Sequence, residues 1–406
     1  MAPHYDAIVI GARCAGAPTA MLLARKGHRV LLVDRATFPS DTVSTHFIHP
    51  PGMAALERWG LRDALAATGC PPVRKYSFDF GPFTIAGSPR AVDGVDEACC
   101  PRRTVLDAML VDAAADAGAE VREAFAVDDV LLDDGAVTGI RGRGADGNTV
   151  MEHARVVIGA DGRNSAVAKS VQPEQYNDKP AVSPAFYSYW SGVGSSGFEV
   201  YVGERCGMAV FPTHDDLALV IVGLPEEDFN AARSDVEGAY LRTVDSVPAL
   251  ADRVRSGKRE ERFRAATDLA GYFRKPYGPG WALVGDAGYH LHPITAQGIT
   301  DAFIDAERLS DALDAAFSER STYDDAMSRY QEARDLCAMP MYEMTFDFAQ
   351  LDQPPPPETQ QLLGAVAGSQ HAMDDFVSVQ AGTLPAPEFF NPENIGRIMA
   401  TQDRPA

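Results

Sequence analysis

The sequence has few cysteines and no long apolar segment. Its six cysteines, among 406 residues, include no Cys-x-x-Cys pair and no spacing with histidine that is typical of a metal site. We therefore expect reduced thiols and no bound metal. No run reaches the roughly 18 apolar residues that span a bilayer. The first expected strand begins almost at the N-terminus, which leaves no room for a signal peptide. These absences predict a cytoplasmic protein.

Positive charge is also scarce. The chain has 36 lysines and arginines against 57 aspartates and glutamates, which gives a formal net charge of −21. Such a chain repels nucleic-acid phosphates and anionic lipid surfaces, so we expect neither nucleic acid nor a membrane as a partner. The length and the 46% hydrophobic content suffice for two cores. We expect a small molecule as the partner and predict no particular oligomeric state.

The first 35 residues have the pattern of a β-α-β unit. Residues 5–11 (YDAIVIG) are a continuous apolar run, typical of a buried parallel strand. Residues 14–26 carry apolar side chains at helical spacing, and residues 29–33 (RVLLV) form the next strand, which Asp34 closes. A unit of about 30 residues is the size of a dinucleotide-binding motif.

The turn of this unit lacks one glycine of the usual Gly-x-Gly-x-x-Gly pattern, since it reads Gly11-Ala12-Arg13-Cys14-Ala15-Gly16. Gly11 permits the tight turn, and Gly16 permits close packing of helix on strand. The backbone N–H groups and the helix N-terminus remain to attract a diphosphate, so we predict an intact site. The Arg13 side chain either adds charge there or points to solvent. Asp34 follows Gly11 by 23 residues, near the spacing of an acid that binds ribose hydroxyls.

A literal Gly-x-Gly-x-x-Gly stands at residues 192–197, but its surroundings do not fit. It follows an aromatic strand and leads into another strand, FEVYV, so no helix offers a dipole there. We predict a flexible β-turn without a phosphate site, and hence one dinucleotide site on the chain.

Two further strand–turn–helix motifs follow. Residues 157–169 (VIGADGRNSAVAK) contain Asp161, and residues 283–307 (LVGDAGYHLHPITAQGITDAFIDAE) contain Asp286 and Gly298. Either motif alone is compatible with an ordinary turn. A helix that begins near Gly298 offers free donors and a positive dipole end to a ligand group that carries negative charge.

With the three motifs in this order, residues 5–315 resemble the FAD-dependent aromatic hydroxylase superfamily, the p-hydroxybenzoate hydroxylase-like flavoproteins. They are also similar to the geranylgeranyl reductases and the flavin-dependent halogenases. The segment Val33–Asp41 (VDRATFPSD) resembles the D/E-R-x-x-F-P of these two groups. At residues 208–212 (MAVFP) the tryptophans of their W-x-W-x-I-P and Y-x-W-x-F-P motifs are absent, and no halogenase pattern surrounds Lys75.

The resemblance implies an α/β fold. It consists of a Rossmann-like FAD-binding domain, an inserted antiparallel β-sheet substrate domain and C-terminal helices. We assign residues 1–72, 101–180 and 270–335 to the FAD domain, 73–100 and 181–269 to the substrate domain, and 336–406 to the C-terminal helical segment.

The resemblance also implies one noncovalent FAD. The first motif cradles its diphosphate, and Asp34 takes the adenosine ribose. Arg103, which begins an R-x-x-x-D-x-x-L pattern, lies against the phosphate–ribityl chain, and Asp286 binds near it. Asp161 serves structure and access. The expected cofactor-binding residues are Gly11, Arg13, Cys14, Ala15, Gly16, Asp34, Arg35, Arg103, Val127, Asp161, Gly285, Asp286, Pro293, Gly298 and Ile299.

The reaction that the resemblance implies is monooxygenation. NAD(P)H docks transiently and reduces the flavin, O₂ adds at flavin C4a, and the resulting hydroperoxide oxygenates an electron-rich aromatic or polyketide-like molecule. A reductase or dehydrogenase acting on C=C or C–C bonds, and a non-catalytic FAD-binding protein, remain alternatives.

Several side chains are candidates for contact with the substrate. His290, His292 and His46 are each either a proton acceptor or a structural hydrogen-bonding group. Tyr187, Tyr189, Phe211 and Pro212 line a pocket or pack in the core. The apolar residues 339–348 form a lid over the substrate or an ordinary packing helix.

Overall fold

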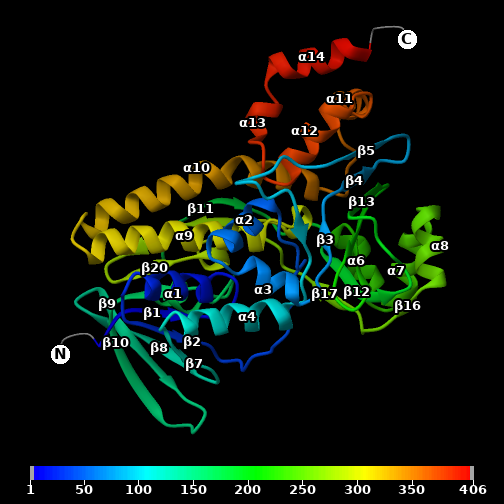
Figure 1. Ribbon diagram of the computed structural model, residues 1–406. Helices are drawn as coiled ribbons and strands as arrows, with labels where there is room; N and C mark the ends of the chain where they lie inside the picture. The colour runs from blue at the N-terminus through cyan, green and yellow to red at the C-terminus, as the bar shows by residue number, and fades with distance from the viewer. Residues whose placement is uncertain (1–3, 403–406) are drawn as a thin grey trace.

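The computed structural model describes residues 4–402, so the first three and last four residues of the assigned segments lie outside it. Figure 1 shows two β-sheets at opposite ends of the molecule, one built mainly from N-terminal strands and one from mid-chain strands. The C-terminal helices lie over the second sheet. This mixed α/β architecture confirms the predicted fold class.

The first sheet contains parallel strands that are far apart in the sequence. Its order is β19-β20-β10-β1-β2-β7, with β1 (Tyr5–Ile10) between β10 (Thr149–Gly159) and β2 (Val30–Val33), and with β20 (Trp281–Leu283) beyond β10. Ile8 pairs with Val157 on one side and with Leu31 on the other. The residues of β2, β20 and the last four positions of β10, and those of β1 apart from Asp6, are buried, as expected for a parallel sheet covered on two sides.

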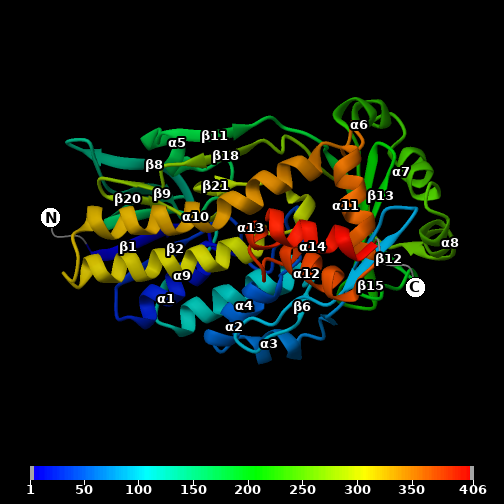
Figure 2. The ribbon, with the colours of Figure 1, turned by 90° about the horizontal axis from the view of Figure 1, so that it is seen from above.

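Three helices cover one face of the first sheet: α1 (Gly16–Arg25), α4 (Arg103–Asp116) and α9 (Gly298–Phe317). The opposite face packs on α5 (Ala166–Val171) and on the antiparallel strands β8 (Ala126–Asp133) and β9 (Ala136–Arg143). Seen from above, α9 and α10 (Tyr323–Ala349) run side by side along the molecule (Figure 2).

The second sheet has the order β16-β12-β15-β14-β13-β4-β5. Its pairs are antiparallel apart from β13 with β4, which are parallel. Because side chains alternate along a strand, Phe186 and Trp190 of β12 face the helices α6 to α8, whereas Tyr187 and Tyr189 face the other way. The strands are β12 (Ala185–Ser191), β13 (Phe198–Gly203), β14 (Cys206–Pro212), β15 (Leu217–Gly223), β4 (Tyr76–Asp79), β5 (Thr84–Gly87) and β16 (Lys258–Arg259).

Two prolines affect the helices in different ways. Residues 235–254 form two helices, α7 (Val236–Asp245) and α8 (Pro248–Ser256), because Pro248 starts the second. Pro340, by contrast, does not end a helix but lies inside α10. Buried side chains on both sides of it, such as Tyr330 and Tyr342, stabilise this helix by packing. Residues 294–297 precede α9, and Ala296 there has a left-handed φ of 57°.

The C-terminal segment contains α11 (Pro357–Ala367), α12 (Gln370–Gln380), α13 (Ala386–Phe389) and α14 (Pro392–Gln402), and the proline-rich stretch at residues 353–356 lies between α10 and α11. The remaining elements are α2 (Pro50–Arg58), α3 (Arg62–Ala67), α6 (Glu226–Ala232), β3 (Pro72–Val73), β6 (Ala98–Cys99), β7 (Glu120–Arg122), β11 (Gln175–Lys179), β17 (Arg264–Ala266), β18 (Gly271–Arg274), β19 (Tyr277–Gly278), β21 (Tyr289–His290), and the 3₁₀ turns η1 (Gly285–Ala287) and η2 (Pro293–Thr295).

Within residues 4–402 no helix is long and apolar enough to cross a membrane. The same residues contain no group of histidine, cysteine and acidic side chains placed to hold a metal ion. All six cysteines are free thiols, and Cys337 is the exposed one among them.

Candidate cofactor and active site

One cavity of about 2030 Å³ extends from the first sheet to the C-terminal helices. Its walls come from the turn after β1, the end of β2, the segments around Asp161 and Asp286, the start of α9, one face of the second sheet, and residues 340–390. Ordinary small-molecule pockets measure about 300–1,000 Å³, so this cavity has room for more than one ligand.

The glycine turn after β1 forms one end of the cavity. Gly11 has a φ of 100°, and a Cβ atom there would lie 2.5 Å from the Ala160 carbonyl oxygen. A Cβ atom on Gly16 would collide with the Gly11 carbonyl oxygen. Only glycine fits at these two positions, which brings the N-terminus of α1 close to the strand and opens it toward the cavity.

Arg13 lines the cavity, and its guanidinium binds protein groups. Its Nη1 lies 2.5 Å from Oδ2 of Asp107 on α4, and the guanidinium also donates to the backbone oxygen and the hydroxyl of Ser40. Asp107 is fully buried and accepts a second charged group, Arg103, at 3.0 Å. Arg13 therefore ties the start of α1 to α4 and to the loop after β2.

Asp34 stands at the end of β2 and holds the glycine turn in place. Its Oδ2 accepts the Ala12 N–H at 2.7 Å, and its Oδ1 accepts the Ala36 N–H at 2.8 Å. Each carboxylate oxygen has a further lone pair. Asp34 can therefore accept a ribose hydroxyl while it keeps the turn.

Asp161 brings an unpaired acceptor to the cavity. Its Oδ2 accepts the Ala166 N–H at 2.6 Å, whereas its Oδ1 is buried without a protein hydrogen-bond partner. Burial raises the pKa of this carboxyl. A buried polar atom without a partner is costly, so the site suits a ligand that donates a hydrogen bond here.

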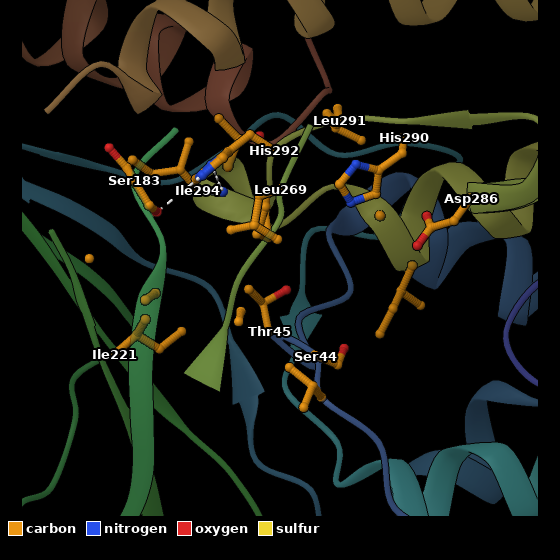
Figure 3. Close-up of a pocket in the computed structure, with 18 of the residues that line it drawn as sticks. Ser44, Thr45, Ser183, Ile221, Leu269, Asp286, His290, Leu291, His292 and Ile294 are labelled. Atoms are coloured by element: carbon orange, nitrogen blue, oxygen red, sulfur yellow. Dashed lines mark hydrogen bonds between the residues drawn. The ribbon is translucent and has the colours of Figure 1, made fainter. Parts of the chain in front are cut away.

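The η1 turn places Asp286 beside the start of α1. Gly285 has a φ of 60°, and a Cβ atom there would lie 2.8 Å from the Ala15 Cβ. This close approach puts the Asp286 carboxylate on the cavity wall, where Figure 3 shows it beside the His290 ring.

The N-terminus of α9 opens into the middle of the cavity. A Cβ atom on Gly298, the first residue of this 20-residue helix, would meet no atom within 4 Å. The first N–H groups of a helix have no partner within it and carry a positive dipole end. This open helix end accommodates a flat ring that carries negative charge on one edge.

These features fit FAD: a glycine turn for a diphosphate, an acid for a ribose, an orphan carboxylate oxygen and an open helix end. The residues predicted to contact the cofactor line this cavity, except Gly16 and Gly285, which shape the turns behind it. Those that line it are Gly11, Arg13, Cys14, Ala15, Asp34, Arg35, Arg103, Val127, Asp161, Asp286, Pro293, Gly298 and Ile299.

His290 and His292 both line the cavity but differ in their hydrogen bonds. His292 donates from Nε2 to the Val182 carbonyl at 2.9 Å and accepts the Ile294 N–H at Nδ1, so both nitrogens are occupied. Burial lowers the pKa of His292 to about 4. His290 donates from Nδ1 to the Ala270 carbonyl at 2.7 Å, which leaves Nε2 as the basic nitrogen of the neutral ring. Burial lowers the pKa of His290 as well.

His46 lies behind the cavity wall. It is fully buried, its Nε2 is hydrogen-bonded to the Tyr189 hydroxyl, and its Nδ1 has no partner. Burial and then the neighbouring arginines, Arg103 first, lower its pKa well below the usual range.

Tyr187 and Phe211 line the cavity, whereas Tyr189 and Pro212 are not among its lining residues. Tyr189 packs under the Arg102 guanidinium, whose central carbon lies 3.9 Å from the ring centre. The Tyr187 hydroxyl is buried and has no partner at hydrogen-bonding geometry.

Helix α10 places apolar side chains from residues 339–348 on two sides. Met344 and Phe348 line the cavity, while Met339, Met341 and Tyr342 pack around Phe273. Sequence reasoning did not find the lining residues Thr45, Met208, Leu363 and Phe376. The alternation in β13 and β14 indicates two faces, but it carries no signal for which face borders an open space.

The glycine-rich loop at residues 192–197 lies outside the cavity lining. Its Ser196 N–H and both serine hydroxyls donate to the Glu199 carboxylate, and Arg253 donates to the Val193 and Gly194 carbonyls. The anion held by this loop is therefore a side chain of the protein itself.

Comparison with known proteins agrees with this geometry. The FAD binding domain family matches residues 4–345. Digeranylgeranylglycerophospholipid reductase 1 of Methanopyrus kandleri is 28% identical over 84% of this chain and 90% of its own length. Phenazine 1,6-dicarboxylic acid hydroxylase PhzS of Lysobacter antibioticus is 25% identical over 93% of this chain and 99% of its own.

Among solved structures, the myxobacterial chondrochloren halogenase CndH has the same fold, with a TM-score of 0.77 at 21% identity over 98% of this chain and 96% of that chain. The chain is thus similar in sequence to a reductase and a hydroxylase, and in fold to a halogenase. The chain belongs to the FAD binding domain family and is a flavoprotein oxidoreductase.

Proposed function

We propose that the protein is an FAD-dependent monooxygenase, which uses NAD(P)H and O₂ to oxygenate an electron-rich small molecule. The observation that carries the proposal is the single cavity that joins the cofactor cradle to an apolar chamber, with a histidine whose basic nitrogen is available on its wall. PhzS is a hydroxylase, and its similarity to this chain extends over nearly its whole length. This similarity supports the same reaction.

Bound FAD supplies electron transfer and the activation of O₂, and the protein supplies binding, orientation and electrostatics. The glycine turn, Asp34 and Asp286 would hold the diphosphate–ribose part. The N–H groups at Gly298 and Ile299, at the positive end of α9, would stabilise negative charge on the reduced ring.

Substrate is held between the start of α9 and the face of the second sheet that carries Tyr187 and Phe211. The Tyr187 ring, a buried residue of the cavity lining, packs against the substrate. His290 is neutral at pH 7 because burial lowers its pKa, so its Nε2 can accept a proton from a phenol or an enol.

Isotope labelling tests the reaction class. With NAD(P)H, a turned-over substrate and ¹⁸O₂, the product should carry one labelled oxygen atom, and turnover should stop without O₂. Unlabelled product formed anaerobically at full rate would establish the reductase alternative, which the relative from Methanopyrus kandleri also supports.

The role of His290 is tested separately through the pH profile. The proton acceptor must be neutral, and burial lowers the pKa of His290, so the acid limb of the wild-type activity should lie below the ordinary histidine pKa of about 6.5. His290→Gln should lower kcat and remove this acid limb. An unchanged limb would assign it to another group.

A further inference from the structure

The part of the cavity beyond the cofactor cradle is large and apolar. Its floor is the face of the second sheet that carries Phe198, Val200, Ala209, Phe211 and Ile221, together with Phe78 of β4. Phe78, Phe198 and Phe211 are each less than 10% exposed, so these side chains are fixed in a packed wall. None of the floor residues is charged.

The C-terminal segment closes the far side of this chamber. Met344 and Phe348 come from the end of α10, Leu351 from the loop after it, Leu363 from α11 and Phe376 from α12. Figures 1 and 2 show α11 and α12 over strands β4 and β5, far from the first sheet. The apolar lining therefore continues well past the flavin-edge helix start at Gly298.

The rim of the chamber carries more negative than positive charge. Glu204, Asp347 and Asp352 are exposed lining residues, and the one cation among the rim residues, Arg205, is already 3.0 Å from Asp228. Phe390, which is 36% exposed, adds an aromatic ring at the same opening. A carboxylate or phosphate at this end is repelled, whereas a neutral tail meets an apolar wall.

We infer that the substrate is an uncharged molecule with an extended apolar part, longer than one aromatic ring, which lies between the second sheet and residues 344–376. The inference rests on the flavin position of the proposed function. It depends on the shape of the wall and not on whether oxygen or hydrogen is transferred. Residues 344–376 then determine which chain length is accepted.

A homologous series of probes tests the inference by binding alone. The FAD-loaded protein is titrated with 4-ethyl-, 4-butyl-, 4-hexyl- and 4-octylphenol, and the change in flavin absorbance gives the dissociation constant. Each added CH₂ group should tighten binding by up to about fourfold, because burial of one CH₂ contributes about 0.8 kcal/mol. Probes of equal length that end in a carboxylate should bind at least tenfold more weakly than the alkyl probes. Equal affinity along the series, or tight binding of the carboxylates, would overturn the inference.

Two variants that narrow the chamber locate the tail. Leu363→Trp and Val200→Phe should each weaken octylphenol binding at least tenfold and leave ethylphenol binding unchanged. Leu336→Trp is the matched control, since Leu336 is 79% exposed on α10 and is not a lining residue. FAD content confirms that each variant is folded. Because two separate wall positions are changed, the test still works if one variant does not fold. Octylphenol affinity that is unchanged in both folded variants would contradict the proposed position.

The labelling experiment and this titration fail independently. If the product carries no ¹⁸O label but affinity increases along the alkylphenol series, the monooxygenase proposal is wrong and the apolar substrate class is supported. If affinity is equal along the alkylphenol series but the product carries the label, the substrate class is wrong and the monooxygenase proposal is supported.

Discussion

Arg13 Nη1 lies 2.5 Å from Asp107 Oδ2, and this ion pair stands where a dinucleotide-binding turn ordinarily has its second glycine. The pair joins the glycine turn before α1 to α4. The Arg13 side chain is 25% exposed and Asp107 is fully buried, so the arginine compensates a carboxylate that has left water.

Arg13→Gly should show whether this pair affects FAD affinity or the stability of the FAD-free protein. FAD affinity should stay within about tenfold of wild type, because the backbone donors and the helix end remain. Stability of the FAD-free protein should fall by about 1.5–3 kcal/mol, the range for hydrogen bonds to charged groups, which denaturant unfolding measures. A loss of FAD affinity well beyond tenfold would show that Arg13 contacts the diphosphate.

Asp286→Ala and Gly194→Ala distinguish the two glycine-rich regions. Asp286→Ala removes a carboxylate from the cavity wall and should weaken FAD binding about 10–100-fold, measured by titration of the FAD-free protein. Gly194 has a φ of 63° outside the cavity, so alanine there should cost about 1–2 kcal/mol of stability and leave FAD affinity unchanged. The reverse pattern would place the cofactor at residues 192–197.

Gly298→Ala should change stability and cofactor binding in opposite directions. Alanine is favoured over glycine in a helix by about 0.5–1 kcal/mol, and the new methyl group meets no protein atom. The FAD-free protein should therefore become more stable while FAD binds more weakly. Gly396→Ala in α14, also without a neighbour within 4 Å, is the control and should leave FAD affinity unchanged. Undiminished FAD binding in Gly298→Ala would mean that the flavin does not approach this helix end.

The buried histidines predict that stability falls in mild acid. The pKa of His292 is about 4 in the folded chain and about 6.5 when unfolded, so its contribution is complete above pH 6.5 and is lost as the pH falls toward 4. One such group changes the free energy of unfolding by about 1.4 kcal/mol for each pH unit in this window. His49, whose pKa is also lowered to about 4 by burial, acts in the same direction.

His292→Asn should reduce this slope by the equivalent of one proton. Asparagine keeps an acceptor for the Ile294 N–H at the start of η2 but does not titrate. Unfolding by denaturant at several pH values between 4 and 7 measures the slope. A slope equal to that of the wild type would show that His292 does not take up a proton on unfolding in this range.

The sequence by itself determined the parts of the cofactor cradle that depend on local chain geometry. Gly11, Gly16 and Asp34 follow from a strand, a turn and a helix within one short segment, and the Asp161 and Asp286 motifs follow in the same way. These residues lie close to their partners along the chain or at fixed strand ends, so spacing predicts them.

Only the tertiary structure decided the features that depend on distant contacts. The partner of Arg13 is 94 residues away, and the carbonyl that occupies His292 Nε2 is 110 residues away, so no local pattern distinguishes His292 from His290. The alternation of Tyr187 and Tyr189 predicted that they share a face, but packing against Arg102 and His46 set Tyr189 apart from the cavity. The continuous helix through Pro340 and the wall of residues 344–376 likewise arise from packing against remote strands, which outweighs local propensity.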